Sequence, residues 1–320
     1  MNILVTTDKN YLPHAHVMLV SLLENNKETP IHLFYIHCDL DDGSIATFRN
    51  AFLGTNLTVS FIQIDRKELP ALDTKGYITP ETYLKIFSPN LLPRTVERIL
   101  YLDPDIVVRK GLGELYKTDL GECLLGAVEE YHLRTYGNTV LKIPEQYKYF
   151  NCGVILIHVE EFRRNKISGK LLSFLQKTNT PLTHNEQDVF NAVLYDKCLY
   201  LHPKWNVHTR ILQEYKYISI ANSQEMREAG SDPAIVHFTS VPKPWDYCCT
   251  NPFQKEYRYY LNKTPYREAK PKGRSYPNMI RKLLLKTIIY RIPRRIKDLF
   301  PLRFRAQVMD MLLRFDGEVT

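Results

Sequence analysis

The sequence lacks the features that would place the protein in a membrane or among small zinc and redox proteins. Its 320 residues contain no apolar run near the roughly 18–20 residues that a membrane-spanning helix needs. The six cysteines form no C-x-x-C pair, which excludes zinc-ribbon and thioredoxin-type motifs. The chain passes directly from Met1 into the strand-like run Ile3-Leu4-Val5, without the basic and apolar regions of a secretory signal. We therefore expect a cytoplasmic protein.

The short signatures of several enzyme classes are also missing. There is no G-x-S-x-G, no H-E-x-x-H, no G-x-x-x-x-G-K-[ST] and no complete G-x-G-x-x-G. The segment Gly111-Leu112-Gly113 is only a fragment of the last pattern. These absences argue against an α/β-hydrolase, a zinc peptidase, a P-loop nucleotidase and a dinucleotide-dependent dehydrogenase.

Basic residues are concentrated at the carboxyl end. Residues 270–320 hold 13 Lys and Arg against 4 Asp and Glu, whereas residues 1–269 hold 30 basic and 31 acidic side chains. The net charge of +8 therefore describes a tail. Within residues 278–292, apolar residues fall on one helical face and lysines on the other: Ile280, Leu283, Leu284 and Ile288 against Lys282 and Lys286.

This tail is typical of a helix that lies on an anionic membrane surface. A helix that docks on its own catalytic domain is the alternative. Nucleic-acid binding is disfavoured because no recognised motif accompanies the charge. We expect the protein to be peripheral on the inner face of the cell membrane.

Apolar runs alternate with helical spacings in the first half of the chain. Strands are expected over residues 3–7, 31–37 and 57–64, separated by a helix that ends near residues 25–26 and another that ends near residue 53. This order predicts an α/β fold with a mostly parallel mixed sheet covered by helices. A helix over residues 79–87, stopped by Pro89 and Pro93, precedes a strand over residues 98–102.

The second half alternates less regularly. Strands are expected over 106–108, 123–128, 154–159 and 235–238, and helices over 160–176 and 186–194. The prolines and glycine between residues 265 and 277 mark a change of character. We therefore expect one domain over residues 1–265 and a basic helical tail over residues 266–320.

The segment Asp103-Pro104-Asp105 follows an apolar strand. Ligands of open parallel sheets bind beyond the carboxyl ends of strands, and carboxylates at i and i+2 of an extended chain point to one side. Two hard oxygen ligands suit Mg²⁺ or Mn²⁺ shared with a diphosphate. Taken alone, so short a motif favours a plain Asp-Pro-Asp turn over a metal site.

Four other positions have the chemistry of a nucleotide-sugar site, and each also has a structural explanation. Tyr11 could stack on a base and Asp8 accept from it, or they could cover and cap a helix start. His237 is suited to be a third metal ligand, or it is a core histidine. Lys243 could neutralise a diphosphate, or it lies on a surface loop.

The segments around residues 151 and 185 have the same two interpretations. Asn151 with Gly153 could bring an amide and bare backbone close to a sugar, or form a turn or bulge that enters the strand over 154–159. Asn185 could cap a helix, with Asp188 in its first turn, and still lie beside a reacting sugar.

Six segments, in order from residue 3 to about residue 246, resemble glycosyltransferase family 8. They are Asp8 with Asn10-Tyr11, Thr82-Tyr83-Leu84-Lys85, Asp103-Pro104-Asp105 after Tyr101-Leu102, Phe150-Asn151-Cys152-Gly153-Val154, Asn185-Glu186-Gln187-Asp188, and His237-Phe238 with Lys243-Pro244-Trp245. The ordered set is far more specific than any one motif.

The resemblance implies a Rossmann-like domain of the glycosyltransferase A type and a retaining transfer of glucose or galactose from a UDP-sugar to a glycan, such as a bacterial lipopolysaccharide. It implies Mn²⁺ or Mg²⁺ on Asp103, Asp105 and His237. It implies donor contacts from Thr7, Asp8, Asn10, Tyr11, Lys85, Asp103, Pro104, Asp105, His237, Ser240 and Lys243. It implies catalytic roles for Gln187, Glu186, Asn151 and Lys243. Because Gln187 is a poor nucleophile, we expect front-face attack by the acceptor.

Four positions depart from the family pattern. Lys85 stands where Arg is common, Glu186 where Asp is usual, Ser240 where Gly often lies, and Glu130 where Asp follows the strand. These departures leave the choice between glucose and galactose open. A protein that binds or hydrolyses UDP-sugars without a true acceptor remains the alternative function, followed by a membrane-associated interaction protein that is not an enzyme.

Overall fold

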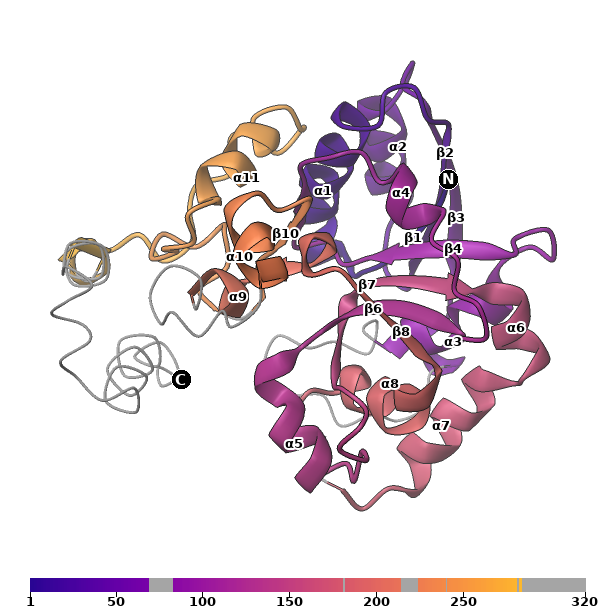
Figure 1. Ribbon diagram of the computed structural model, residues 1–320. Coiled ribbons are helices and arrows are strands. Elements are labelled where there is room, and N and C mark those ends of the chain that lie inside the picture. Colours follow the sequence, from indigo (N-terminus) through magenta and orange to yellow (C-terminus); the bar gives the residue numbers. More distant parts are fainter. Residues whose placement is uncertain (69–82, 181, 214–223, 240, 281, 284–320) are drawn as a thin grey trace, which may run out of the picture.

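A seven-stranded mixed sheet forms the centre of the molecule. The computed structural model describes residues 1–68, 83–180, 182–213, 224–239, 241–280 and 282–283 (Figure 1). The strand order is β3-β2-β1-β4-β7-β6-β8. The strands are β1 (Asn2–Thr6), β2 (Ile31–His37), β3 (Leu57–Gln63), β4 (Arg98–Leu102), β6 (Leu125–Glu129), β7 (Phe150–His158) and β8 (Cys198–Leu201). Only β7 runs antiparallel to its neighbours β4 and β6, which confirms the mostly parallel mixed sheet.

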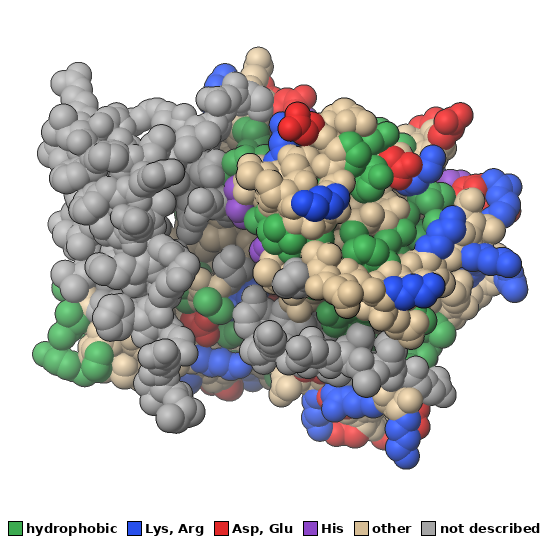
Figure 2. Space-filling view, turned by 90° about the horizontal axis from the view of Figure 1, so that it is seen from below, with side chains coloured by type: hydrophobic (Ala, Val, Ile, Leu, Met, Phe, Trp, Pro, Cys, Tyr) green, Lys and Arg blue, Asp and Glu red, His purple; other side chains and the backbone are tan. Residues whose placement is uncertain are grey.

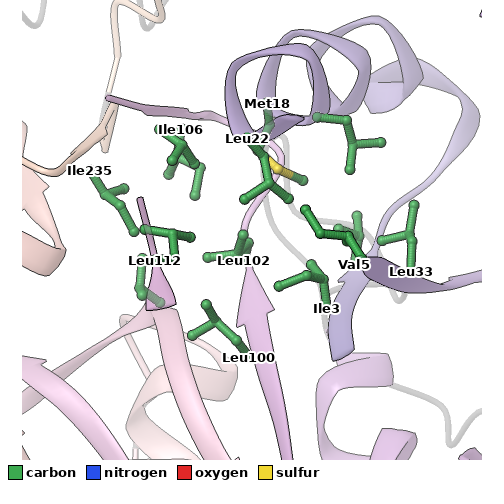
Figure 3. Packing of buried hydrophobic residues seen from close by; sticks show 14 of the residues in the cluster. Ile3, Val5, Met18, Leu22, Leu33, Leu100, Leu102, Ile106, Leu112 and Ile235 are labelled. Atoms are coloured by element: carbon green, nitrogen blue, oxygen red, sulfur yellow. The ribbon is translucent and has the colours of Figure 1, made fainter. Parts of the chain in front are cut away.

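Alternate residues of each strand feed two separate cores, because successive side chains of a strand point to opposite faces. Ile3 and Val5 of β1 pack with Met18 and Leu22 of α1 (Leu12–Glu24), whereas Leu4 packs on the other face (Figure 3). The first face also carries α2 (Asp42–Ala51) and α4 (Gly113–Tyr116). The second face carries α3 (Leu84–Leu91), α6 (Val159–Arg164), α7 (Ile167–Lys177) and α8 (Glu186–Leu194).

A three-stranded sheet packs beside α1, since Ile106, Val108 and Ile235 share the core of the first face. It consists of β5 (Ile106–Val108), β10 (Ile235–His237) and β9 (Val207–His208), in that order. The remaining helices are α5 (Arg134–Thr139), α9 (Thr209–Gln213), α10 (Gln224–Ser231) and α11 (Gln254–Leu261). Residues of α11, namely Tyr257 and Leu261, share a buried cluster with Val17 of α1. The late part of the chain therefore returns to the first helix.

Two expected helices differ from the structure. Pro89 does not stop α3 but lies inside it. A proline has no N–H to donate to the Lys85 carbonyl, and the Ser88 hydroxyl donates to this carbonyl instead. The helix expected over residues 160–176 is two helices. Asn165 donates its side-chain amide to the Glu161 carbonyl, and Lys166 adopts a left-handed conformation (φ 53°) that turns the chain into α7.

β7 begins at Phe150, four residues earlier than the expected strand at 154. Ala127 of β6 pairs with Ile155 of β7, whereas Glu129 pairs with Phe150, so the register shifts between these two pairs. The bulge expected near residue 151 therefore lies within β7. The helix residues expected at 79–82, Ser240 and residues 284–320 of the tail lie outside the described residues.

Surface charge is mixed on the face drawn in Figure 2. Basic and acidic side chains are interspersed there, in agreement with the nearly balanced charge of residues 1–269. In the part of the chain that the structure describes, no helix has both the length and the apolarity to cross a bilayer.

The buried His16 predicts a loss of stability in acid. Burial lowers its pKa from 6.5 to about 4, although its Nδ1 contacts the Leu12 carbonyl at 2.8 Å. Between pH 6.5 and about pH 4, His16 binds a proton in the unfolded chain but not in the folded chain. Acidification from pH 7.5 to 5 should therefore cost about 2 kcal/mol through this group. In urea titrations, the difference in the free energy of unfolding between pH 7.5 and pH 5 should be about 2 kcal/mol smaller for His16→Leu than for the wild type. An unchanged difference would contradict the assignment.

Candidate active site

Asp103 and Asp105 lie just beyond the carboxyl end of β4. The Asp103 N–H donates to the Gly153 carbonyl of β7 (2.8 Å), and the Phe238 N–H donates to the Asp105 carbonyl (3.0 Å). The segment is thus anchored on one side to the central sheet and on the other to the end of β10. A plain surface turn would not need these anchors.

His237 joins the two carboxylates. Its Nε2 lies 3.6 Å from Asp103 Oδ2 and 3.2 Å from Asp105 Oδ1, and one ligand atom from each residue falls within 4.8 Å of the others. All three come from strand ends that meet at one edge, because β10 pairs antiparallel with β5. Two carboxylates and an imidazole form a ligand set suited to a divalent cation.

Two lysines compensate the carboxylates from opposite sides. Lys243 Nζ donates to Asp105 Oδ2 (2.6 Å) and to the Phe238 carbonyl (2.9 Å). Lys85 Nζ lies 3.5 Å from Asp103 Oδ1, to which Tyr101 also donates its hydroxyl (2.6 Å). Burial opposes ionisation of Asp105, but Lys243 and His237 outweigh it and hold the pKa of this carboxyl below its usual range.

Asn206 orients the histidine. Its Oδ1 lies 2.9 Å from His237 Nδ1, and its Nδ2 donates to Asn151 Oδ1 (2.7 Å). Because the amide oxygen can only accept, Nδ1 carries a proton, and Nε2 is the ring nitrogen that faces the carboxylates. Nothing in the sequence singled out Asn206, a lone polar residue between Trp205 and a short strand.

A buried acid continues this chain of contacts. Asn151 donates to Glu130 Oε2 (2.6 Å), and Glu130 Oε1 lies 3.1 Å from His132 Nδ1 and 2.9 Å from His208 Nε2. Burial alone would raise the pKa of Glu130, but the two histidines hold it well below its ordinary value. Glu130 is therefore a fixed anion behind Asn151.

Two of the departures from the family pattern face each other. Lys85 Nζ donates to Glu186 Oε1 (3.1 Å) and to the Cys152 carbonyl (2.9 Å). A cation shorter than Arg thus meets an acid longer than Asp, so the changes compensate in length. Burial opposes the charge on Lys85, yet Asp103 and Glu186 raise its pKa well above the usual value.

Gln187 and Asp188 lie at the start of α8, next to β7. The Cys152 N–H donates to Gln187 Oε1 (3.0 Å). Asn185 occupies the N-cap position of α8, but its side chain makes no capping hydrogen bond, so the expected cap is wrong. Asp188 lies in the first turn, as expected, and its Oδ2 accepts the N–H of His184 just before the helix (2.9 Å).

The end of β1 supplies a second part of the site. Asp8 is buried and caps the turn Lys9–Tyr11 by accepting the Tyr11 N–H (3.0 Å), as the structural interpretation expected. Asn10 Nδ2 lies 3.4 Å from Asp8 Oδ2, and the Thr7 hydroxyl donates to the Asp8 carbonyl (3.1 Å). Thr7, Asp8, Asn10 and Tyr11 therefore form one cluster.

Aromatic rings connect this cluster to the carboxylates. Trp245, two residues after Lys243, meets Tyr11 edge to face (5.6 Å between centroids) and stacks on His14 (3.4 Å). His14 Nδ1 lies 2.7 Å from the Tyr257 hydroxyl, and burial lowers the pKa of His14 to about 3. The neutral His14 ring is a second residue that sequence reasoning missed. Pro104 is buried between the carboxylates.

Comparison with solved structures defines the class of fold. The galactosyltransferase LgtC, solved with donor and acceptor sugar analogues, superposes with a TM-score of 0.73 at 21% identity, covering 83% of this chain and 96% of that chain. The bifunctional glycosyltransferase WbbM superposes with a TM-score of 0.70 at 19% identity over 84% of this chain and 50% of that chain. The fold is that of a glycosyltransferase of the A type.

The sequence profile of glycosyl transferase family 8 matches residues 2–249, and the chain belongs to this family. It is therefore a transferase. General stress protein A of Bacillus subtilis is 29% identical over 273 residues, covering 83% of this chain and 94% of that protein. Lipopolysaccharide 1,2-glucosyltransferase of Escherichia coli K12 is 26% identical (85% and 80% covered). Lipopolysaccharide 1,3-galactosyltransferase of Salmonella typhimurium is 29% identical (76% and 72% covered).

Gly153 leaves the space that His237 occupies. A Cβ at residue 153 would lie 2.1 Å from His237 Cε1 and 2.8 Å from Asp103 Oδ2. Gly153→Ala should therefore displace the histidine and weaken Mn²⁺ binding at least about tenfold, measured by calorimetry. Gly169→Ala in α7 is the control, because its Cβ would meet nothing within 4 Å. Equal Mn²⁺ affinity in the two variants would contradict the proposed ligand set.

Proposed function

We propose that the protein is a retaining hexosyltransferase that moves glucose or galactose from a UDP-sugar to a glycan acceptor, such as lipopolysaccharide or another bacterial surface polysaccharide. The observation that carries the proposal is the Asp103–Asp105–His237 group at the end of β4, next to Lys243. The printed names of two relatives, a glucosyltransferase and a galactosyltransferase of lipopolysaccharide, support this substrate class.

In this proposal Asp103, Asp105 and His237 hold Mn²⁺ or Mg²⁺. The bound cation supplies positive charge to the diphosphate of the donor and to the leaving group. The ligand set fits such an ion, because Asn206 holds His237 with Nε2 toward the two carboxylates, and one ligand atom of each residue lies within 4.8 Å of the others. Lys243 and Lys85 supply further fixed charge that cannot be withdrawn into solvent, since both are buried.

The cluster at the end of β1 receives the nucleoside. Tyr11 offers a ring face to the uracil, and Asp8 an acceptor for its N–H. Thr7 and Asn10 lie beside Asp8 and complete the ribose side. Pro104 borders the diphosphate, and the family pattern assigns Ser240, which lies outside the described residues, to the donor as well.

Gln187, Glu186 and Asn151 contact the transferred sugar. Retention normally requires a nucleophile on the face opposite the leaving group. Gln187 is an amide and a poor nucleophile. The acceptor hydroxyl therefore attacks from the face that the diphosphate leaves, and the departing phosphate accepts the proton.

Residues 1–265 form the catalytic domain, and residues 266–320 associate with an anionic membrane surface on its cytoplasmic side. The last described residues of the tail fit this role. Tyr276, Met279, Ile280 and Leu283 recur at helical spacing and are 44–76% exposed. Apolar side chains at this spacing would enter the interfacial region of a bilayer. A protein without a true acceptor that only binds or hydrolyses UDP-sugars is the second candidate.

The first test is UDP release by the full-length protein from UDP-glucose and UDP-galactose, with and without acceptor glycans. We expect release that requires Mn²⁺, is abolished by EDTA and increases when a suitable acceptor is added. Release that no acceptor increases would favour the hydrolase. No release from any UDP-sugar, together with no metal-dependent binding of UDP, would disprove both enzymatic proposals.

A substitution of one carboxylate tests the metal site. Asp103→Asn keeps the volume of the side chain but removes a charged ligand, and should lower transfer by about 100-fold or more. Asp119→Asn is the matched control. This carboxylate is exposed, and within the described structure its side chain accepts one hydrogen bond, from the Gly121 N–H. Transfer by Asp103→Asn at the rate of the control would contradict the assignment of Asp103.

A further inference from the structure

The side-chain amide of Gln187 is held at both ends. A backbone N–H can only donate, so the atom that faces Cys152 N at 3.0 Å must be the amide oxygen Oε1. The amide nitrogen Nε2 then faces the hydroxyl of Tyr149 at 3.3 Å. The amide therefore has one defined orientation, with one N–H and one oxygen lone pair left over.

The Tyr149 hydroxyl has a defined direction too. It donates to Asp188 Oδ1 at 2.6 Å, so its oxygen is left to accept the hydrogen from Gln187. Tyr149 is 1% exposed, and burial together with Asp188 raises its pKa well above the usual value. The phenol consequently stays protonated and keeps its donor direction.

Asp188 is the fixed end of this chain of hydrogen bonds. It is fully buried, and its two oxygens accept from Tyr149, from the Tyr136 hydroxyl (2.8 Å) and from the His184 N–H (2.9 Å). A carboxylate enclosed by three donors has little freedom to approach a sugar. Its position favours an anchoring role over that of a nucleophile.

Asn191 fixes the register between α8 and β7. It accepts the Phe150 N–H (2.7 Å) and donates to the Phe150 carbonyl (2.8 Å) and the Gln187 carbonyl (2.9 Å). Tyr149 and Gln187 are therefore placed by the same buried contact, and the geometry of their hydrogen bond is set before any substrate arrives.

We infer that Tyr149 is a positioning residue, which transmits the fixed direction of Asp188 to the Gln187 amide so that one N–H and one lone pair of that amide face the transferred hexose. The inference rests on the proposed function. A fixed amide can accept from a hydroxyl of the sugar and donate to its ring or linking oxygen, and so select one orientation of the donor. An amide free to rotate would present the two groups in either order.

The test compares two tyrosines that share one carboxylate. Tyr149→Phe removes a hydrogen bond to Asp188 and also the partner of Gln187 Nε2. Tyr136→Phe removes a hydrogen bond to Asp188 and the acceptor of the Thr183 N–H (3.4 Å), but leaves the partner of Gln187 in place. With the UDP-sugar that the wild type uses, Tyr149→Phe should lower kcat about tenfold and leave KM for the donor within about twofold. Tyr136→Phe should stay within about threefold of the wild type, and thermal unfolding should show similar losses of stability for both.

A second background separates positioning from general stability. Because Tyr149 acts through Gln187, Tyr149→Phe should cause no further loss of kcat in Gln187→Ala protein. Equal kcat losses in the two tyrosine variants, or a full additional loss in the Gln187→Ala background, would overturn the inference while leaving the proposed function intact. A wild-type protein that turns over no UDP-sugar would instead overturn the proposed function, and the inference with it.

Discussion

The arrangement at the end of β4 depends on charge compensation of two neighbouring carboxylates. Asp105 is almost fully buried, and Asp103 lies beside it. Two such anions repel each other and lose hydration, so the fold must supply cations at close range. Lys85 comes from α3, Lys243 from the segment after β10, and His237 lies between the carboxylates. Elements far apart in the sequence are thus held together by the same pair of acids.

The same charge compensation also connects the two ends of the site. Lys243 is bound to Asp105, and two residues later Trp245 packs on His14 and Tyr11. On the other side, Lys85 bridges Asp103 and Glu186, whose neighbour Gln187 accepts from Cys152. The cluster at the end of β1 and the start of α8 are therefore connected through the carboxylates by direct contacts.

The sequence was informative where a metal-binding side chain stands at the end of an expected strand. Asp103, Asp105 and His237 could be predicted because hard ligands followed apolar runs, and the structure brings them together. The sequence was silent about Asn206 and Tyr149, because their roles come from partners on other elements and not from local spacing. The prediction of one continuous helix over residues 160–176 was wrong for a related reason. The apolar spacing continues through Asn165, and only the backbone conformation of Lys166 shows the break.

The double hydrogen bond between Asn191 and the backbone of Phe150 has a consequence for selectivity. It joins α8 to the start of β7, so the two elements are held in one relative position at this point. Glu186, Gln187 and Asn151 all project from these two elements. Epimeric hexoses differ only in the direction of one hydroxyl group, and in the proposed hexosyltransferase a preformed wall of these side chains would distinguish them by fit. A change of donor preference would then require new side chains on this wall, since a change in a hinge elsewhere would not alter its shape.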